Sequence, residues 1–179
     1  AKYYLEKLVQ GSKVYIFVGG HVAQAAVPTL ARVNLDCIVL EDREDFAKPE
    51  LFPGARRTRL VDMEHLEEVC RDITSDDYIC VMTRGHQHDF LVEKQILRTP
   101  ASYIGVIGSR KKKEAVFAKL RQEGYTDQDL ARIKTPMGLD IQAETPAEIA
   151  VSIAAEMIME RARRNHIERP NEGGKEPCV

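Results

Sequence analysis

Short apolar runs alternate along the chain with segments whose apolar residues recur at helical spacing. Four runs have the length and composition of buried strands: residues 14–18, 37–40, 78–82 and 103–107. A more polar run at 56–60 predicts a peripheral strand. Runs that are apolar throughout are typical of parallel strands covered on both faces. Because helical segments separate these runs, the pattern predicts an α/β fold with a doubly wound, mostly parallel, Rossmann-like sheet in three layers.

Helical segments are predicted at residues 22–33, 64–71, 90–97, 110–122 and 126–133, and from residue 146 onward. The last is well specified, because Thr145 can cap it, Pro146 suits the first helical position and Glu148 closes a capping box. Ile153 and Ile158 belong to a broad apolar face that we expect to pack on the sheet. We expect a linker or the stub of a preceding element at 1–12, a domain at 13–164 and a disordered tail at 165–179.

The composition and charge of the chain argue against some classes of function. The chain has 179 residues, 44% of them hydrophobic, enough for one domain with a sizeable core. Its formal charge of −2 and pI near 6.3 argue against a nucleic-acid partner. The four cysteines form no C-x-x-C pair, and the longest apolar helical stretch is too short to span a bilayer. We expect reduced cysteines and a soluble, cytoplasmic protein that does not bind membranes.

The clearest candidate site is the turn after the first strand. A dinucleotide-binding G-x-G-x-x-G/A motif laid over residues 18–23 places Gly20 at its second glycine and Ala23 at its third. Val18 stands where the first glycine belongs, and a β-branched residue disfavours unusual backbone angles. The turn therefore predicts either a nucleotide site at a helix N-terminus or an ordinary strand-to-helix turn.

An acidic residue follows the second predicted strand. Asp42 lies 22 residues after Gly20, close to the spacing at which this fold places the acceptor for an adenosine ribose. Arg43 beside it suits a 2′-phosphate. Asp42 thus favours NAD and Arg43 favours NADP, and both cofactors stay open.

Polar residues gather between 83 and 89, directly after the fourth predicted strand. Ligands bind at the carboxyl ends of strands in open α/β sheets, so we expect Thr83, Arg84 and His86 to contact a phosphate or a pterin edge. His88 and Asp89 are metal-ligand types as well. Alternate residues of a loop point apart and a third well-spaced ligand is lacking, so we expect no metal site.

Two later segments are further candidates. Ser109 can cap the helix that starts at Arg110, and such a helix N-terminus binds anions, although capping alone explains the serine. Gly138 and Asp140 belong to the loop before the last helix. No pairing of nucleophile and base can be argued from spacing, so no catalytic residue is assigned.

Six ordered blocks together resemble the C-terminal Rossmann-type domain of the XdhC/CoxI family. They are Gly20-His-Val-Ala23, Asp42-Arg43 with Phe46-Ala47, Phe52-Pro53, Thr83-Arg-Gly-His86 with Asp89, Tyr103 to Arg110, and Pro136 to Asp140 followed by Thr145 to Ile149. The resemblance covers roughly nine-tenths of the chain, and ordered blocks are more specific than a lone glycine motif. Two departures are Val18, where the family pattern has glycine, and the lack of a match to the family's cysteine-bearing N-terminal domain.

The resemblance implies an accessory factor for the maturation of xanthine dehydrogenase and related molybdenum hydroxylases. Such a factor would bind molybdopterin cofactor as cargo, or NAD or NADP. Its partners would be the apo-hydroxylase and a cysteine desulfurase, and it would form a homo-oligomer. It also implies that the loop at 138–140 lies near the crevice. An NAD(P)-dependent oxidoreductase and a degenerate Rossmann module for partner docking remain alternatives. The expected ligand-binding residues are Gly19, Gly20, His21, Val22, Asp42, Arg43, Thr83, Arg84, Gly85, His86, Gly108, Ser109, Arg110, Gly138 and Asp140.

Overall fold

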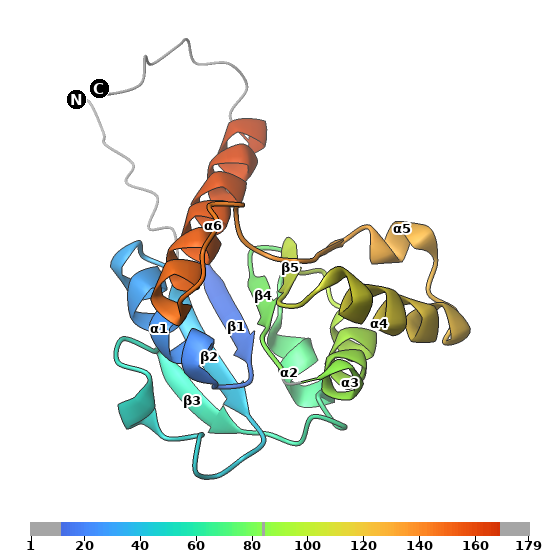
Figure 1. The fold of residues 1–179 in the computed structure, drawn as a ribbon, viewed down its shortest axis with the longest axis horizontal. Coiled ribbons are helices and arrows are strands. Elements are labelled where there is room, and N and C mark those ends of the chain that lie inside the picture. Colours follow the sequence, from blue (N-terminus) through green and yellow to red (C-terminus); the bar gives the residue numbers. More distant parts are fainter. Residues whose placement is uncertain (1–11, 84, 169–179) are drawn as a thin grey trace, which may run out of the picture.

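A parallel sheet organises the chain in the computed structural model, which describes residues 12–83 and 85–168 (Figure 1). In this part of the chain the sheet has six strands in the order β3-β2-β1-β4-β5-β6, all of them parallel. The strands are β1 (Lys13–Phe17), β2 (Asp36–Glu41), β3 (Arg57–Leu60), β4 (Tyr78–Val81), β5 (Tyr103–Val106) and β6 (Ile133–Lys134). Because the order reverses between β1 and β4, a crevice is expected at their carboxyl ends.

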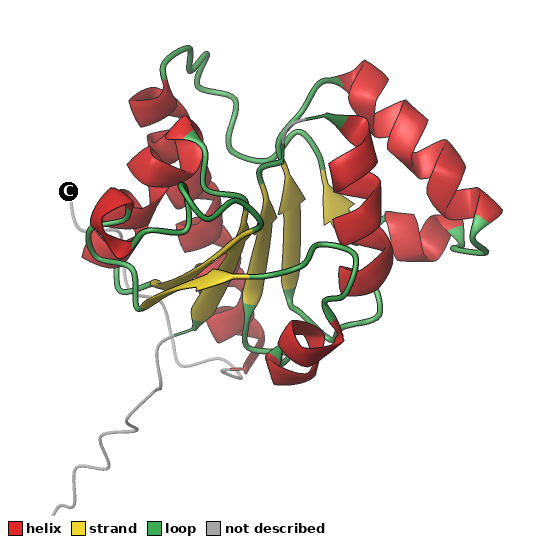
Figure 2. Ribbon diagram, turned by 90° about the horizontal axis from the view of Figure 1, so that it is seen from below, coloured by secondary structure: helices red, strands yellow, loops and turns green. Residues whose placement is uncertain are grey.

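Helices cover both faces of the sheet (Figure 2). They are α1 (His21–Arg32), the 3-10 turn η1 (Pro49–Leu51), α2 (Glu67–Asp72), α3 (His86–Ile96), α4 (Arg110–Gln122), α5 (Asp127–Leu130) and α6 (Pro146–Glu168). One core packs α1 and α6 against the sheet, and a second core packs α2, α3 and α4 against the opposite face. The predicted doubly wound, three-layer α/β fold is confirmed.

The period of a strand explains why β1 serves both cores. Val14 and Ile16 belong to the core under α1 and α6, whereas Tyr15 and Phe17 belong to the core under α2 to α4. Successive side chains of a strand point to opposite faces, so a strand covered on both sides must be apolar throughout. β3 lies at the edge of the sheet, as its more polar sequence predicted.

Several element boundaries differ from the prediction. α3 begins at His86, so residues 86–89 form the first turn of a helix and not the predicted loop. The predicted helix over 126–133 is wrong beyond Leu130, because the chain straightens and Ile133 begins β6. β6 has only two residues, which are too few to show the alternation of a strand in the sequence. α6 continues to Glu168, beyond the predicted end of the domain at 164. Most of the predicted linker at 1–12 and of the predicted tail at 165–179 lies outside the described residues.

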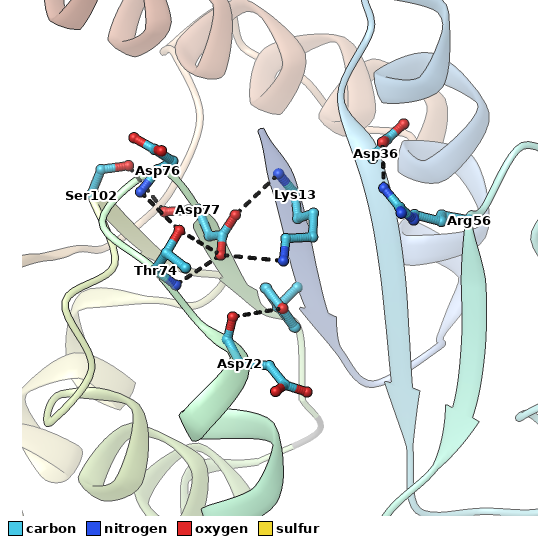
Figure 3. Close-up of polar contacts among 9 residues, drawn as sticks. Lys13, Asp36, Arg56, Asp72, Thr74, Asp76, Asp77 and Ser102 are labelled. Carbon is cyan, nitrogen blue, oxygen red and sulfur yellow. Dashed lines mark hydrogen bonds and ion pairs between the residues drawn. The ribbon is translucent and has the colours of Figure 1, made fainter. Parts of the chain in front are cut away.

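The amino-terminal edge of the sheet is closed by polar contacts around Asp77 (Figure 3). Its carboxylate accepts hydrogen bonds from the Lys13 N–H at 3.3 Å and the Thr74 N–H at 2.8 Å. The Asp77 carbonyl accepts from the Ser102 backbone and hydroxyl, both at 3.0 Å. These donors and acceptors satisfy one another, so this edge holds the strands in register.

The chain described here contains no helix that is both long and apolar enough to cross a bilayer.

Candidate functional site

The turns that follow β1 and β4 border a crevice at the carboxyl ends of these strands. The crevice has a volume of about 240 Å³ and is lined by Val18, Asp42, Arg43, Met63, Thr83 and His88. Three of these residues, Asp42, Met63 and His88, also line an adjoining open hollow of about 590 Å³. Small-molecule sites commonly occupy such a volume at the point where strand order reverses.

Val18 forms the start of the glycine turn in a conformation that suits glycine. Its φ is +78° and its side chain is buried, while its N–H donates to the Leu40 carbonyl at 2.8 Å. A β-branched residue at positive φ is strained by about 1–3 kcal/mol. The motif alignment that put Val18 at the first glycine position therefore identified a residue whose backbone does adopt a left-handed conformation.

Gly19 and Gly20 have different roles, although both were predicted to bind a ligand. A Cβ on Gly19 would lie 2.5 Å from Cζ of Phe52, so the fold itself requires a glycine there. A Cβ on Gly20 would meet no atom of the described chain within 4 Å. Nothing in the packing explains the absence of a side chain at Gly20, which leaves the backbone open to close approach from outside.

Gly20 is also the N-cap residue of α1. Among the described residues no side chain caps this helix, and its first turn contains no acidic residue. The first N–H groups of a helix lack partners within the helix, and together with the helix dipole they favour an anion. His21 and Val22, both predicted site residues, lie in this first turn, with His21 exposed and Val22 half-buried.

Glu41, the last residue of β2, holds the glycine turn in place. Its fully buried carboxylate accepts from the Gly19 N–H at 2.7 Å, from the backbone N–H groups of Asp42 and Arg43, both at 3.1 Å, and from two nitrogens of the Arg43 guanidinium at 2.9 and 3.0 Å. Burial acts to raise the pKa of Glu41, but these donors and the charge of Arg43 lower it to about 2. Glu41 is therefore an ionised structural anchor.

Asp42 and Arg43 both line the crevice. Asp42 lines both the crevice and the adjoining hollow, and burial together with the neighbouring Glu41 raises its pKa. The Arg43 guanidinium bonds to Glu41 and stacks 3.9 Å from the ring centre of Phe46. Asp42 is thus placed where a ligand diol could reach it, while Arg43 is already oriented by the protein.

Thr83 connects the crevice with a buried ion pair. Its hydroxyl donates to Oδ1 of Asp89, and Oδ2 of Asp89 lies 2.6 Å from Nζ of Lys112. Lys112 also donates to the carbonyls of Thr83 and Ile107, both at 3.3 Å. Lys112 therefore joins the turn after β4 to the turn after β5, and Asp89 is buried and paired within the protein.

Glu93 lies one turn after Asp89 on α3 and is 2% exposed. Among the described residues none donates to its Oε2. Burial and the nearby charge of Asp89 raise the pKa of Glu93 to about 8, so the carboxyl is largely neutral at pH 7. The group lines a small internal cavity with Gly108, Lys112 and other residues, separate from the crevice lining.

The remaining predicted site residues are dispersed. Ser109 caps α4, as predicted, by accepting from the Lys112 N–H at 3.3 Å, and the exposed Arg110 begins that helix. Gly138 donates from its N–H to Glu156 at 2.8 Å and packs against α6. Neither Gly138 nor Asp140 lines the crevice or the adjoining hollow. The expectation that this loop lies near the crevice and contacts a ligand stays a prediction.

Three residues at the site were missed from the sequence: Glu41, which holds the glycine turn, and Met63 and His88, which line the crevice. Glu41 was masked by the acidic residue that follows it, since spacing alone cannot choose between neighbours. His88 reaches the crevice because α3 starts early, and Met63 because the chain turns back after β3. Gly85 is the N-cap residue of α3. Arg84 and the His86 side chain, both predicted site residues, lie outside the described part of the structure.

This combination of a parallel sheet, a reversal of strand order and a glycine turn at an uncapped helix defines a Rossmann-type domain. The profile of the XdhC Rossmann domain family matches residues 14–157, and the chain belongs to this family. The resemblance stated from the sequence blocks is confirmed.

Relatives and a solved structure agree with this assignment. The chain is 29% identical to the uncharacterised protein YqeB of Escherichia coli K12, over 82% of the chain and 27% of YqeB. It is 24% identical to a probable xanthine dehydrogenase subunit of Bacillus subtilis, over 89% of the chain and 46% of that protein. The crystal structure of a xanthine dehydrogenase from Bacillus halodurans superposes with a TM-score of 0.74 at 25% identity, covering 89% of the chain and 45% of that structure. The chain spans less than half the length of these relatives.

Proposed function

We propose that this domain acts in the maturation of xanthine dehydrogenase-type molybdenum hydroxylases and binds a phosphate-bearing cofactor, a nucleotide or molybdopterin, in the β1/β4 crevice. Membership of the XdhC Rossmann domain family and the names of two relatives support the link with xanthine dehydrogenase. The protein partners we propose are the apo-hydroxylase and a cysteine desulfurase that supplies sulfur for the cofactor.

The observation that carries the ligand proposal is the open Gly20 at the uncapped N-terminus of α1. A phosphate group placed there would accept hydrogen bonds from the first N–H groups of the helix. Nucleotides and molybdopterin share a phosphate ester, so this feature suits both.

The remaining crevice residues suit the rest of such a ligand. Asp42 offers a carboxylate to hydroxyl or amino groups, and Met63 offers an apolar surface to a ring. The Thr83 hydroxyl, which donates to Asp89, has lone pairs available to a donor. Glu41 is saturated by its present donors, so Asp42 is the carboxylate that we expect to contact a ligand.

A titration of the whole chain with molybdopterin cofactor, NADH and NADPH, followed by fluorescence, tests the proposal. The diagnostic variant is Gly20→Asp. Aspartate is a favoured N-cap residue, so α1 should keep its stability, while the added carboxylate repels a phosphate. Thr126→Asp at the N-cap of α5 is the matched control, because it adds the same charge to a distant helix.

We expect submicromolar binding of one ligand, at least a tenfold loss in Gly20→Asp and no change in Thr126→Asp. Pterin binding without turnover supports the maturation role. Oxidation of NADH or NADPH with a carbonyl substrate would instead make the domain an oxidoreductase. Binding of no ligand, or equal binding by both variants, would overturn the crevice proposal.

A further inference from the structure

The outer surface of α6 is apolar, in addition to its buried face. Ala150, Ile153 and Met157 pack inward, whereas Val151 is 53% exposed and Ile158 is 40% exposed. Ile158 was predicted to belong to the buried face, so its exposure is a correction. A helix with apolar residues on both faces is normally covered on both.

Val151 and Ile158 are part of a continuous surface that we call the α6 stripe. Its members are the small or aliphatic residues Ala147, Val151, Ala155, Ile158 and Ala162. They are three or four residues apart, the spacing that places side chains on one face of a helix. Figure 1 shows α6 running beside α1 and extending past the strands at its C-terminal end. None of the stripe residues lines the crevice.

We infer that the α6 stripe binds the same stripe of a second copy of this chain, with the two helices antiparallel. The stripe is nearly symmetric about Ala155, with a branched aliphatic residue on either side and an alanine beyond each. Antiparallel pairing about this point places Val151 against the partner subunit's Ile158. The small side chain at the centre permits a close approach of the helix axes, near 8 Å.

Charges beside the stripe favour the antiparallel direction. Glu148 and Arg163 are exposed and lie on the same flank of α6 at opposite ends of the stripe. In an antiparallel pair, equal flanks meet with their ends exchanged, so Glu148 approaches the partner subunit's Arg163. Two parallel helices would instead keep Glu148 and the partner subunit's Arg163 about 22 Å apart along the axis, at 1.5 Å per residue. Glu148 already accepts from two backbone N–H groups, and Arg163 already donates to Glu160 of its own chain at 3.0 Å. A carboxylate has further lone pairs, however, and a guanidinium has further N–H donors.

The oligomeric state of the whole chain is the first test. We expect light scattering after size exclusion to give about twice the chain mass of 20.2 kDa. Val151→Glu and Ile158→Glu should each raise the dissociation constant of the dimer at least tenfold, without changing the circular dichroism spectrum, because both positions are exposed. Leu60→Glu is the matched control: this residue is also exposed, at 56%, but lies on β3.

Disulfide cross-linking tests the direction. In a Cys178→Ser background, Ala155→Cys should form a dimer on mild oxidation, because the two copies of residue 155 face each other. Ala147→Cys should not, since two copies would lie about 24 Å apart at 1.5 Å per residue. Combining Ala147→Cys with Ala162→Cys should restore cross-linking.

Three outcomes would overturn the inference: a monomer at all concentrations, a dimer weakened equally by Leu60→Glu, or cross-linking through Ala147→Cys alone. A monomer that nevertheless binds molybdopterin would leave the proposed crevice function intact, since the stripe and the crevice are separate surfaces.

Discussion

Glu41 at the end of β2 and Glu93 on α3 are both buried carboxyl groups, yet their pKa values shift in opposite directions. Glu41 is surrounded by donors from the glycine turn and from Arg43, and its pKa falls to about 2. Glu93 lies beside another carboxylate with no donor to its Oε2 from the described chain, and its pKa rises to about 8.

The difference shows that the supply of donors, more than burial, decides the charge of an acid in this domain. Burial by itself acts to raise the pKa of both carboxyl groups. On the β2 side the backbone supplies N–H groups that stabilise the anion, so the charge holds a turn in place. On the α3 side Lys112 is engaged by Asp89, and Glu93 keeps its proton. Four measurements on Glu41, Glu93 and the glycine turn test this difference and its consequences.

Removing the anchored carboxylate should have the largest effect. Glu41→Ala leaves the Gly19 N–H without its acceptor and Arg43 without its partner, so we expect a loss of about 3 kcal/mol in the free energy of unfolding by urea. Asp42→Ala should cost less than about 0.5 kcal/mol. In the wild type, the stabilisation by Glu41 is present above pH 4.5 and is lost as the pH falls toward 2. Equal losses in the two variants would contradict the anchoring role.

Neutralising Glu93 should stabilise the protein. With its folded pKa raised from 4.5 to about 8, the folded state binds more protons than the unfolded state between these values. Wild-type stability should therefore decrease as the pH rises through this window, by about 3 kcal/mol up to pH 7. Glu93→Gln removes this ionisation, so its unfolding free energy should exceed the wild-type value near pH 8 and vary less with pH. A less stable Glu93→Gln at pH 8 would refute the assignment.

Alanine substitutions at Gly19 and Gly20 should differ in their effect on stability, because only Gly19 packs closely against another side chain. Gly19→Ala should lower the unfolding free energy by about 2 kcal/mol, since its Cβ would lie 2.5 Å from Phe52 and the ring would have to move. Gly20→Ala should leave stability within about 0.5 kcal/mol, because its Cβ enters open space. Similar losses in both variants would mean that Gly20 is also required by the fold.

Val18 should show the smallest net change. Val18→Gly relieves the strain of φ +78° but removes a buried side chain, and these two effects are of similar size. Val18→Ala loses most of the buried surface and keeps a Cβ at positive φ. Thermal unfolding should therefore rank Val18→Gly above Val18→Ala by about 1 kcal/mol. The opposite order would show that the valine conformation is not strained.

Much of the sheet could be predicted, because its buried strands must be apolar on both faces. The runs that contain Ile16, Val39 and Ile79 carried this signal, and Thr145 with Pro146 marked the start of α6. The position of β6 could not be predicted, since two residues are too few to show a period. The early start of α3 at His86 was hidden by polar residues that read equally well as a loop.

The candidate site was only partly predictable. Gly20, Asp42, Arg43 and Thr83 could be proposed from their positions after strands, because the carboxyl ends of parallel strands share one edge of the sheet. Met63 and His88 complete the lining from elements whose placement depends on how the chain folds back.

The pattern of residues near one another in the chain indicated the class of fold, the positions of its main strands and the family, because apolar period, glycine turns and helix caps act over short distances. It also identified Val18 as the exceptional residue of the first turn. The tertiary structure decided which of two neighbouring acids faces inward, that Glu41 and Glu93 carry different charges, and that Val151 and Ile158 remain exposed. These properties depend on donors, charges and surfaces contributed by distant segments, and only packing brings those segments together.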